Sequence, residues 1–123
     1  MVGFPIPFAT RLTLSSLAGP PIPLIAVKAA GVDLMSVGFD RELTAGDIDP
    51  ANWSGRWMGQ TITGVLAATA GQFAQFTFVV DGVAAGPDVV NYNPPPFDVT
   101  NIIDGSPAAA FSDFPATAAF LSF

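Results

Sequence analysis

The sequence contains one long stretch without a charged side chain, the 24 residues from Trp57 to Val80 between Arg56 and Asp81. A stretch of this kind is expected to be buried or covered. A membrane-spanning helix needs about 20 predominantly apolar residues, and the stretch is long enough for one. It also contains glutamines, threonines and glycines, however, and these disfavour a membrane helix.

Apolar and polar residues alternate in this stretch with a period of two, which is the pattern of a half-buried strand. Phe76, Phe78 and Val80, for example, fall on one face of an extended chain. Ala70-Gly71 offers small residues at which a first strand can end, and Asp81-Gly82 predicts the next turn. The stretch is therefore predicted to form two paired strands.

The second face of these predicted strands is polar but uncharged, with Thr61, Thr63, Gln75 and Thr77. Charged residues make up 11% of the whole chain, against about 25% in an average soluble domain. Either uncharged polar side chains coat an isolated domain, or neighbouring subunits cover part of its surface. We favour the second explanation and expect the polar face to lie near a neighbour.

Charge is unevenly distributed along the chain, which has a net charge of −6. Residues 1–32 contain Arg11 and Lys28 and no acid, whereas the remainder contains Arg41 and Arg56 against ten acids, so the two parts carry +2 and −8. Neither part has a cluster of basic residues. Binding to nucleic acid is therefore not expected, since it requires a basic surface.

The pattern of the remaining sequence also predicts short strands, which are separated by Gly, Pro and Asp. About seven or eight strands are expected, and this number and spacing predict an all-β sandwich in a single domain, residues 1–123. One short helical turn is predicted to begin at Pro50, with Asp49 as its cap.

Both ends of the chain are apolar, and we predict that they make assembly contacts. The N-terminal arm, Met1–Ala9, is rich in proline, which excludes a helix, and it has neither the basic nor the uninterrupted apolar region of a secretory signal. The arm either packs across its own domain or docks on a neighbouring subunit. The residues predicted to make these contacts are Phe4, Pro5, Ile6, Pro7 and Phe8 in the arm and Phe120 and Phe123 in the tail.

The sequence offers little chemistry for catalysis, because histidine and cysteine are both absent. Carboxylates remain for acid–base chemistry, and four of the ten acids, Asp40, Glu42, Asp47 and Asp49, lie in one predicted exposed loop. A raised pKa requires burial, which an exposed loop does not offer, and the spacing of these acids does not fit a calcium-binding EF-hand. We predict no catalytic, cofactor-binding or metal site. Asp104-Gly105-Ser106, which is similar to an aspartic-protease triplet, is predicted to be a turn.

Three aromatic residues, Trp53, Trp57 and Tyr92, allow two interpretations. Exposed on one face they would form a platform for sugar rings, whereas buried they would fill the core of a sandwich. We favour the core.

Several short motifs resemble bacterial immunoglobulin-like modules, which occur in adhesins and in phage structural proteins. Residues 36–43 and 48–53 resemble the opening of such a module, residues 89–92 before the prolines resemble its penultimate strand, and residues 104–111 resemble its closing strand. The resemblance covers residues 34–115. These motifs are typical of a fold and not of a site, so no catalytic residue is carried over.

The resemblance implies an immunoglobulin-like β-sandwich used for display, adhesion or capsid decoration. It divides the domain into an arm with the first strands (1–33), an immunoglobulin-like body (34–115) and an apolar tail (116–123). With the low charge and the apolar ends, it leads us to expect a non-enzymatic phage virion protein that decorates or cements a capsid. Its expected partners are itself and other virion proteins, with no membrane and no nucleic acid. The alternative is a fibre or adhesin module that binds host glycans.

Overall fold

The computed structural model describes residues 17–94 and 98–119, which form strands and loops. One 3₁₀ turn, η1 (Pro50–Asn52), lies between β3 and β4. The prediction of an all-β chain is confirmed. The strands are β1 (Pro23–Lys28), β2 (Leu34–Phe39), β3 (Gly46–Ile48), β4 (Trp53–Trp57), β5 (Gln60–Ala70), β6 (Phe73–Val83), β7 (Val89–Tyr92) and β8 (Phe111–Ala118).

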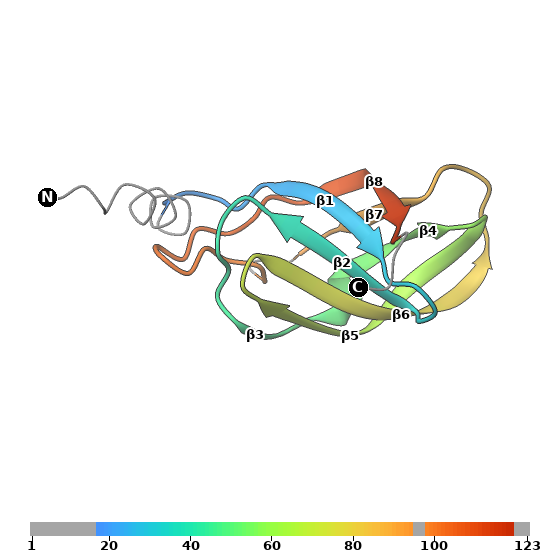
Figure 1. Ribbon diagram of the computed structural model, residues 1–123, viewed down its shortest axis with the longest axis horizontal. Helices are drawn as coiled ribbons and strands as arrows, with labels where there is room; N and C mark the ends of the chain where they lie inside the picture. Colours follow the sequence, from blue (N-terminus) through green and yellow to red (C-terminus); the bar gives the residue numbers. More distant parts are fainter. Residues whose placement is uncertain (1–16, 95–97, 120–123) are drawn as a thin grey trace, which may run out of the picture.

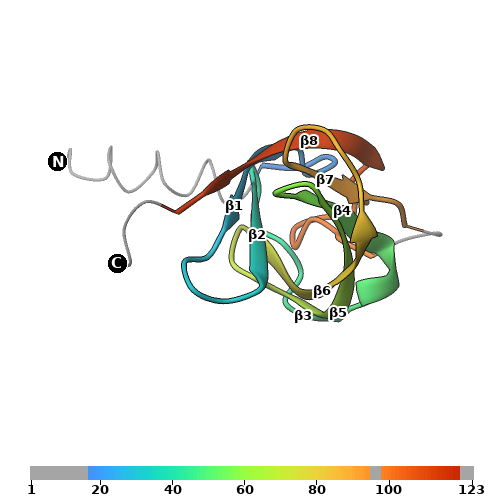
Figure 2. The ribbon, with the colours of Figure 1, turned by 90° about the vertical axis from the view of Figure 1, so that its right-hand side faces the viewer.

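The strands close into a barrel, as the views from the side and along the long axis show (Figures 1 and 2). Around the ring the order is β5-β4-β7-β8-β1-β2-β6, and β6 pairs again with β5. β1 and β8 are parallel, and the other neighbours in the ring are antiparallel. The prediction of an immunoglobulin-like β-sandwich is therefore wrong, because the sheet is a seven-stranded mixed barrel and not two stacked sheets.

The closure depends on the long strand β5, which pairs with different partners along its length. Its first part pairs with β4 and its last part with β3, while its other edge pairs with β6. The β5–β6 register shifts between Gln60 and Ile62 and again between Gly64 and Leu66. Such irregularities bend a strand and increase its twist. β5 can therefore curl around and join strands that a sandwich would place in separate sheets.

Gly64 shows why the bend in β5 needs a glycine. A Cβ atom at this position would overlap the carbonyl oxygen of Pro50 in η1. The absence of a side chain lets η1 pack directly on the backbone of β5.

Two of the three turns predicted between Pro50 and Gly82 are present in the structure. The turn after Ala70 is confirmed, as is the helical turn beginning at Pro50, where the Asp49 carboxylate accepts a hydrogen bond from the Ala51 N–H at 2.9 Å. The turn predicted at Asp81-Gly82 is wrong, because β6 continues to Val83. Gly82 adopts a φ of 115° within the strand, a conformation that glycine tolerates without ending the strand.

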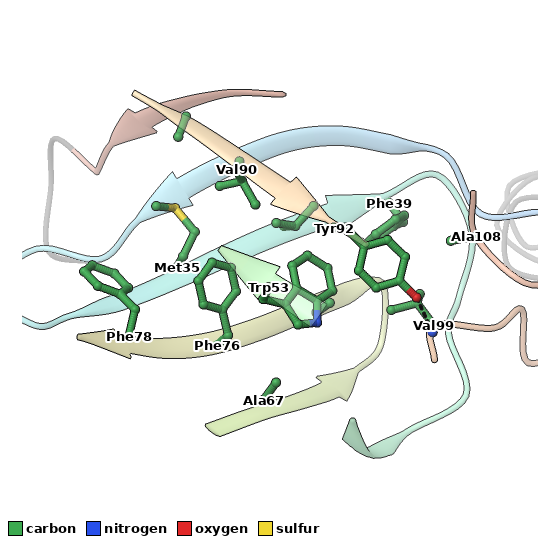
Figure 3. Close-up of a cluster of buried hydrophobic side chains, with 14 of the residues drawn as sticks. Met35, Phe39, Trp53, Ala67, Phe76, Phe78, Val90, Tyr92, Val99 and Ala108 are labelled. Carbon is green, nitrogen blue, oxygen red and sulfur yellow. Dashed lines mark hydrogen bonds between the residues drawn. The ribbon is translucent and has the colours of Figure 1, made fainter. Parts of the chain in front are cut away.

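The interior of the barrel is filled by large side chains around Trp53 (Figure 3). The Trp53 ring lies 4.5 Å from the Tyr92 ring and 5.4 Å from the Phe76 ring, measured between centroids. Met35 and Phe39 are buried in the same cluster. The indole N–H of Trp53 is buried without a hydrogen-bond partner among the described residues, so its packing outweighs an unsatisfied donor.

Tyr92 is fully buried, yet its hydroxyl has a partner. The backbone N–H of Val99 donates a hydrogen bond of 2.9 Å to the Tyr92 oxygen (Figure 3). Burial raises the pKa of Tyr92 from 10.0 to about 12, since the phenolate would lose its hydration in the core. The neutral phenol is therefore the form that the folded barrel holds.

We expect alkaline pH to unfold the protein through Tyr92. Because the pKa is higher in the folded state, stability is unchanged by this group below pH 10.0 and falls as the pH rises toward about 12. The loss should reach about 2 to 3 kcal/mol. Urea unfolding across this range measures it, and absorbance reports tyrosinate formation by the only tyrosine in the chain.

The matched control is Tyr92→Phe. It should be less stable at neutral pH by about 1 to 3 kcal/mol, because the Val99 N–H loses its acceptor. It should also lack most of the alkaline fall. An equally steep fall in this variant would contradict the assignment to Tyr92.

Candidate assembly surface

Part of the outer wall of β1, β2, β6 and β5, here called the uncharged face, is made of side chains that carry no charge. Strand alternation places its residues outward, because their neighbours Met35, Val37, Ala74 and Phe76 point into the core. Most residues of the face are paired with residues of the face on neighbouring strands, so the face is continuous across the wall. Its residues are Ile25, Leu34, Ser36, Leu66, Ala68, Phe73, Gln75 and Thr77.

Apolar side chains occupy much of the uncharged face. Leu66 is 68% exposed, and Ile25 and Phe73 are each about half exposed. Ile25 and Phe73 approach each other over Gly38, where an added Cβ would lie 3.0 Å from one side chain and 3.1 Å from the other. Ile25 and Phe73 therefore form one apolar patch, and Leu66 is exposed farther along the same wall beside Thr77. Exposed apolar surface of this kind marks interaction sites.

A hollow of about 410 Å³ lies in the uncharged face, and we call it the wall groove. It is open along its length, and it crosses the wall from β2 over β6 and β5 to β3 and η1. Its floor and sides are mainly apolar, with polar groups from Gln75 and Thr77. The lining residues are Leu34, Asp47, Ile48, Pro50, Leu66, Ala67, Ala68, Gln75 and Thr77.

Negative charge is confined to the β3 rim of the wall groove. Asp47 is exposed there and is the one charged residue among those that line the groove in the described part of the chain. The nearby Asp98 carboxylate is engaged in hydrogen bonds. It accepts from the Asp49 N–H at 3.1 Å and from the Asn52 side-chain amide at 3.1 Å. The groove is therefore apolar with one acidic rim.

The structure divides the polar face that the sequence predicted. Gln75 and Thr77 belong to the uncharged face. Thr61 and Thr63 are half-buried and pair with Arg56 and Ser54 of β4, on a different part of the wall. The four residues share two strands, but the bend in β5 separates them.

The assembly residues predicted from the sequence, Phe4–Phe8 with Phe120 and Phe123, lie outside the described residues. Leu66 and Phe73 were missed as surface residues. A signal for Leu66 exists in the sequence, because two consecutive apolar residues, Val65-Leu66, interrupt the alternation. The break corresponds to the register shift in β5, which leaves both side chains exposed.

The acids considered for chemistry do not converge on a common site. Asp40 forms an ion pair of 2.8 Å with Arg41 and accepts a hydrogen bond from the Ile22 N–H. Asp49 caps η1, and Asp47 stands on the groove rim. Within residues 17–94 and 98–119, no three His, Cys, Asp or Glu residues are grouped as a metal site would require.

Asp104-Gly105-Ser106 forms a turn, as predicted. The Ser106 N–H donates a hydrogen bond of 3.0 Å to the Asp104 carboxylate. Hydrogen bonds from Ser106 hold the pKa of Asp104 below its usual value, because they stabilise the charged form. The carboxylate has a structural role in this turn.

The aromatic residues do not form a platform. Trp53 and Tyr92 are in the core, which confirms the interpretation that we favoured. Trp57 is half-buried, and the Lys28 ammonium lies 5.9 Å from its ring centroid.

A second hollow, of about 420 Å³, lies over β4, β7 and β8 and is more polar than the wall groove. Ser54, Asn91, Asn93 and Ser112 contribute hydroxyl and amide groups, and Phe111 contributes an aromatic side. The side-chain oxygen of Asn91 is engaged, since it accepts a hydrogen bond of 2.7 Å from the Asp113 N–H. We call this hollow the polar hollow.

Comparison of the chain with protein-family models, with curated proteins and with solved structures finds no match. The resemblance to immunoglobulin-like modules therefore gains no support from known proteins. A search for membrane spans among the described residues found no helix with the length and hydropathy to cross a bilayer.

We expect Asp98→Ala to loosen the β3–η1 side of the wall groove. The substitution removes the acceptor for the Asp49 N–H and for the side chain of the buried Asn52. Unfolding by urea should show a loss of about 1 to 3 kcal/mol. Asp33→Ala, at an exposed turn residue, is the matched control and should change stability little. Equal losses in the two variants would contradict this role.

Proposed function

We propose that this protein is a non-enzymatic structural subunit of a virion, which decorates or cements a capsid through contacts between subunits. The uncharged face is the observation that supports the proposal most strongly. It places the apolar side chains of Leu66, Phe73 and Ile25 in water among uncharged neighbours. Covering such a surface contributes about 25 cal/mol per Å² before the costs of association.

The interior of the barrel also favours a structural role. Trp53, Tyr92, Phe39 and Phe76 fill the space in which larger barrels hold a ligand. The two hollows described above lie on the outer wall and are open. A role that uses outer surfaces suits this architecture better than catalysis in a central cavity.

The distribution of charge favours the outside of a capsid over its lumen. Residues 33–123 carry a net charge of −8, and an acidic body is repelled by the phosphates of a packaged genome. The partners proposed are further copies of the chain and the proteins of the capsid shell.

Deletion of Met1–Ala9 tests whether assembly depends on the arm. We expect the truncated chain to fold, because its barrel strands begin at Pro23, and to sediment as a monomer. The full chain should form larger species under the same conditions. Circular dichroism and thermal melting confirm folding, and sedimentation velocity measures assembly. Normal assembly of the truncated chain would contradict a role for the arm.

The second candidate function is that of a glycan-binding fibre or adhesin module, and the polar hollow is the feature that favours it. Hydroxyl and amide groups beside an aromatic ring are suited to sugars. A glycan array beside the sedimentation profile separates the candidates. Binding by a chain that stays monomeric supports the adhesin, whereas assembly without glycan binding supports the capsid protein.

A further inference from the structure

The wall groove has no occupant within the described part of the chain, and its chemistry selects among the segments that could fill it. Leu34, Leu66, Ile48 and Pro50 offer apolar contacts on both sides of β5 and β6. The groove is open and crosses four strands, from β2 over β6 and β5 to β3, which suits an extended segment better than a compact ligand. Its polar groups come from Gln75 and Thr77 near the middle.

We propose that the wall groove of one subunit binds residues 4–8 of the N-terminal arm of a neighbouring subunit, with Arg11 of the arm against Asp47 on the rim. The inference rests on the proposed function, since it identifies the surface through which the subunits assemble. Each copy has one arm to donate and one groove to fill, so the contact can join two subunits reciprocally or link them head to tail.

The composition of the arm fits the groove. Residues 4–8 read Phe-Pro-Ile-Pro-Phe, with large apolar side chains at every second position. Two prolines favour an extended backbone and remove two N–H donors that would otherwise need partners in an apolar groove. A segment that is already extended loses less conformational entropy on binding. This is the principle by which proline-rich peptides bind shallow grooves.

The polar groups of the groove can donate hydrogen bonds to the backbone carbonyl groups of the arm. Thr77 accepts a hydrogen bond of 3.2 Å from the Leu66 N–H, and its own O–H can donate to a bound backbone. Gln75 donates to the Ser36 hydroxyl at 3.0 Å, which holds its amide on the wall beside the groove. Proline-containing segments keep all their carbonyl acceptors, so donors in the groove suit this ligand.

Charge complementarity gives the arm its direction. Residues 1–32 contain no acid, and Arg11 is the only charged side chain before Lys28. Asp47 is the charged residue on the groove rim. An exposed pair of this kind adds little affinity, but it disfavours the reversed orientation and binding of the acidic body itself.

The start of the described chain is fixed at one end of the barrel, which sets the reach of the arm. The Asn101 side chain donates to the Leu17 and Gly19 carbonyls at 2.8 Å, and Asp104 accepts from the Gly19 N–H at 3.0 Å. The chain enters β1 from this end, at the left of Figure 1. From there, nine extended residues back to Phe8 span at most about 30 Å. A reach of this order allows the arm to extend past its own barrel to an adjacent subunit.

Cross-linking between two variants tests the pairing, and the full-length chain is suitable because it contains no cysteine. Phe8→Cys protein is mixed with Leu66→Cys protein and treated with a short bis-maleimide. The control replaces the second partner with Met58→Cys, which is 76% exposed on the β4–β5 turn and outside the uncharged face. Cross-linked peptides are identified by mass spectrometry.

We expect the Phe8–Leu66 product between chains to form several-fold faster than the Phe8–Met58 product, because docking raises the local concentration of the two thiols. Arg11→Glu in the Phe8→Cys chain alone, or Asp47→Arg in the Leu66→Cys chain alone, should reduce the cross-linking rate. The two changes together should restore it.

Three results would overturn the inference. If the chain assembles but the Phe8–Leu66 product forms no faster than the control, assembly uses another surface and the proposed function stands. If a chain with both cysteines cross-links only within itself, the arm occupies its own groove. If the full chain does not assemble, the proposed function fails and the inference fails with it.

Discussion

The pairing of β1 with β8 is the contact on which the barrel depends. It is the parallel pair of the ring, and it joins Ala26, Val27 and Lys28 to Ala116, Thr117 and Ala118 across most of the chain. Parallel ladders are slightly less stable per residue than antiparallel ones, so this short ladder also needs stabilisation by side-chain packing. Ala26 and Ala116 contribute that packing, because both are buried against the core. Without this pairing β1 and β8 would become open edges, which favour aggregation.

Closure also determines which surfaces remain for function. Large aromatic side chains fill the interior, so interactions with other molecules have to use the outside of the wall. The wall is not uniform, because the bend at Gly64 separates the polar region beside β4 from the uncharged face over β2 and β6. The uncharged polar and apolar residues of the sequence are thus concentrated on one part of the barrel wall, and the wall groove lies in that part.

Local structure could be predicted from the sequence more accurately than the way the strands join. Alternation predicted the paired strands of the uncharged stretch, and the expectation that aromatic residues fill the core of a β domain predicted the burial of Trp53 and Tyr92. The alternation only distinguishes inward from outward side chains, and this distinction is the same in a sandwich and in a barrel. The bend of β5 depends on its two register shifts, of which the sequence marks one by the break at Val65-Leu66, and on a contact between Gly64 and Pro50, which alternation does not predict. The exposure of Leu66 follows from the register shift, whereas Phe73 lies on the outward side of β6 with Gln75 and Thr77.

We propose that assembly covers the uncharged face. Hydroxyl-radical footprinting of the assembled and dispersed chain measures the accessibility of individual side chains. We expect Leu66 and Phe73 to be oxidised more slowly in the assembly, while the exposed Met58 stays reactive and the buried Met35 stays protected in both states. Equal oxidation of Leu66 and Phe73 in the assembled and dispersed chain would contradict this proposal.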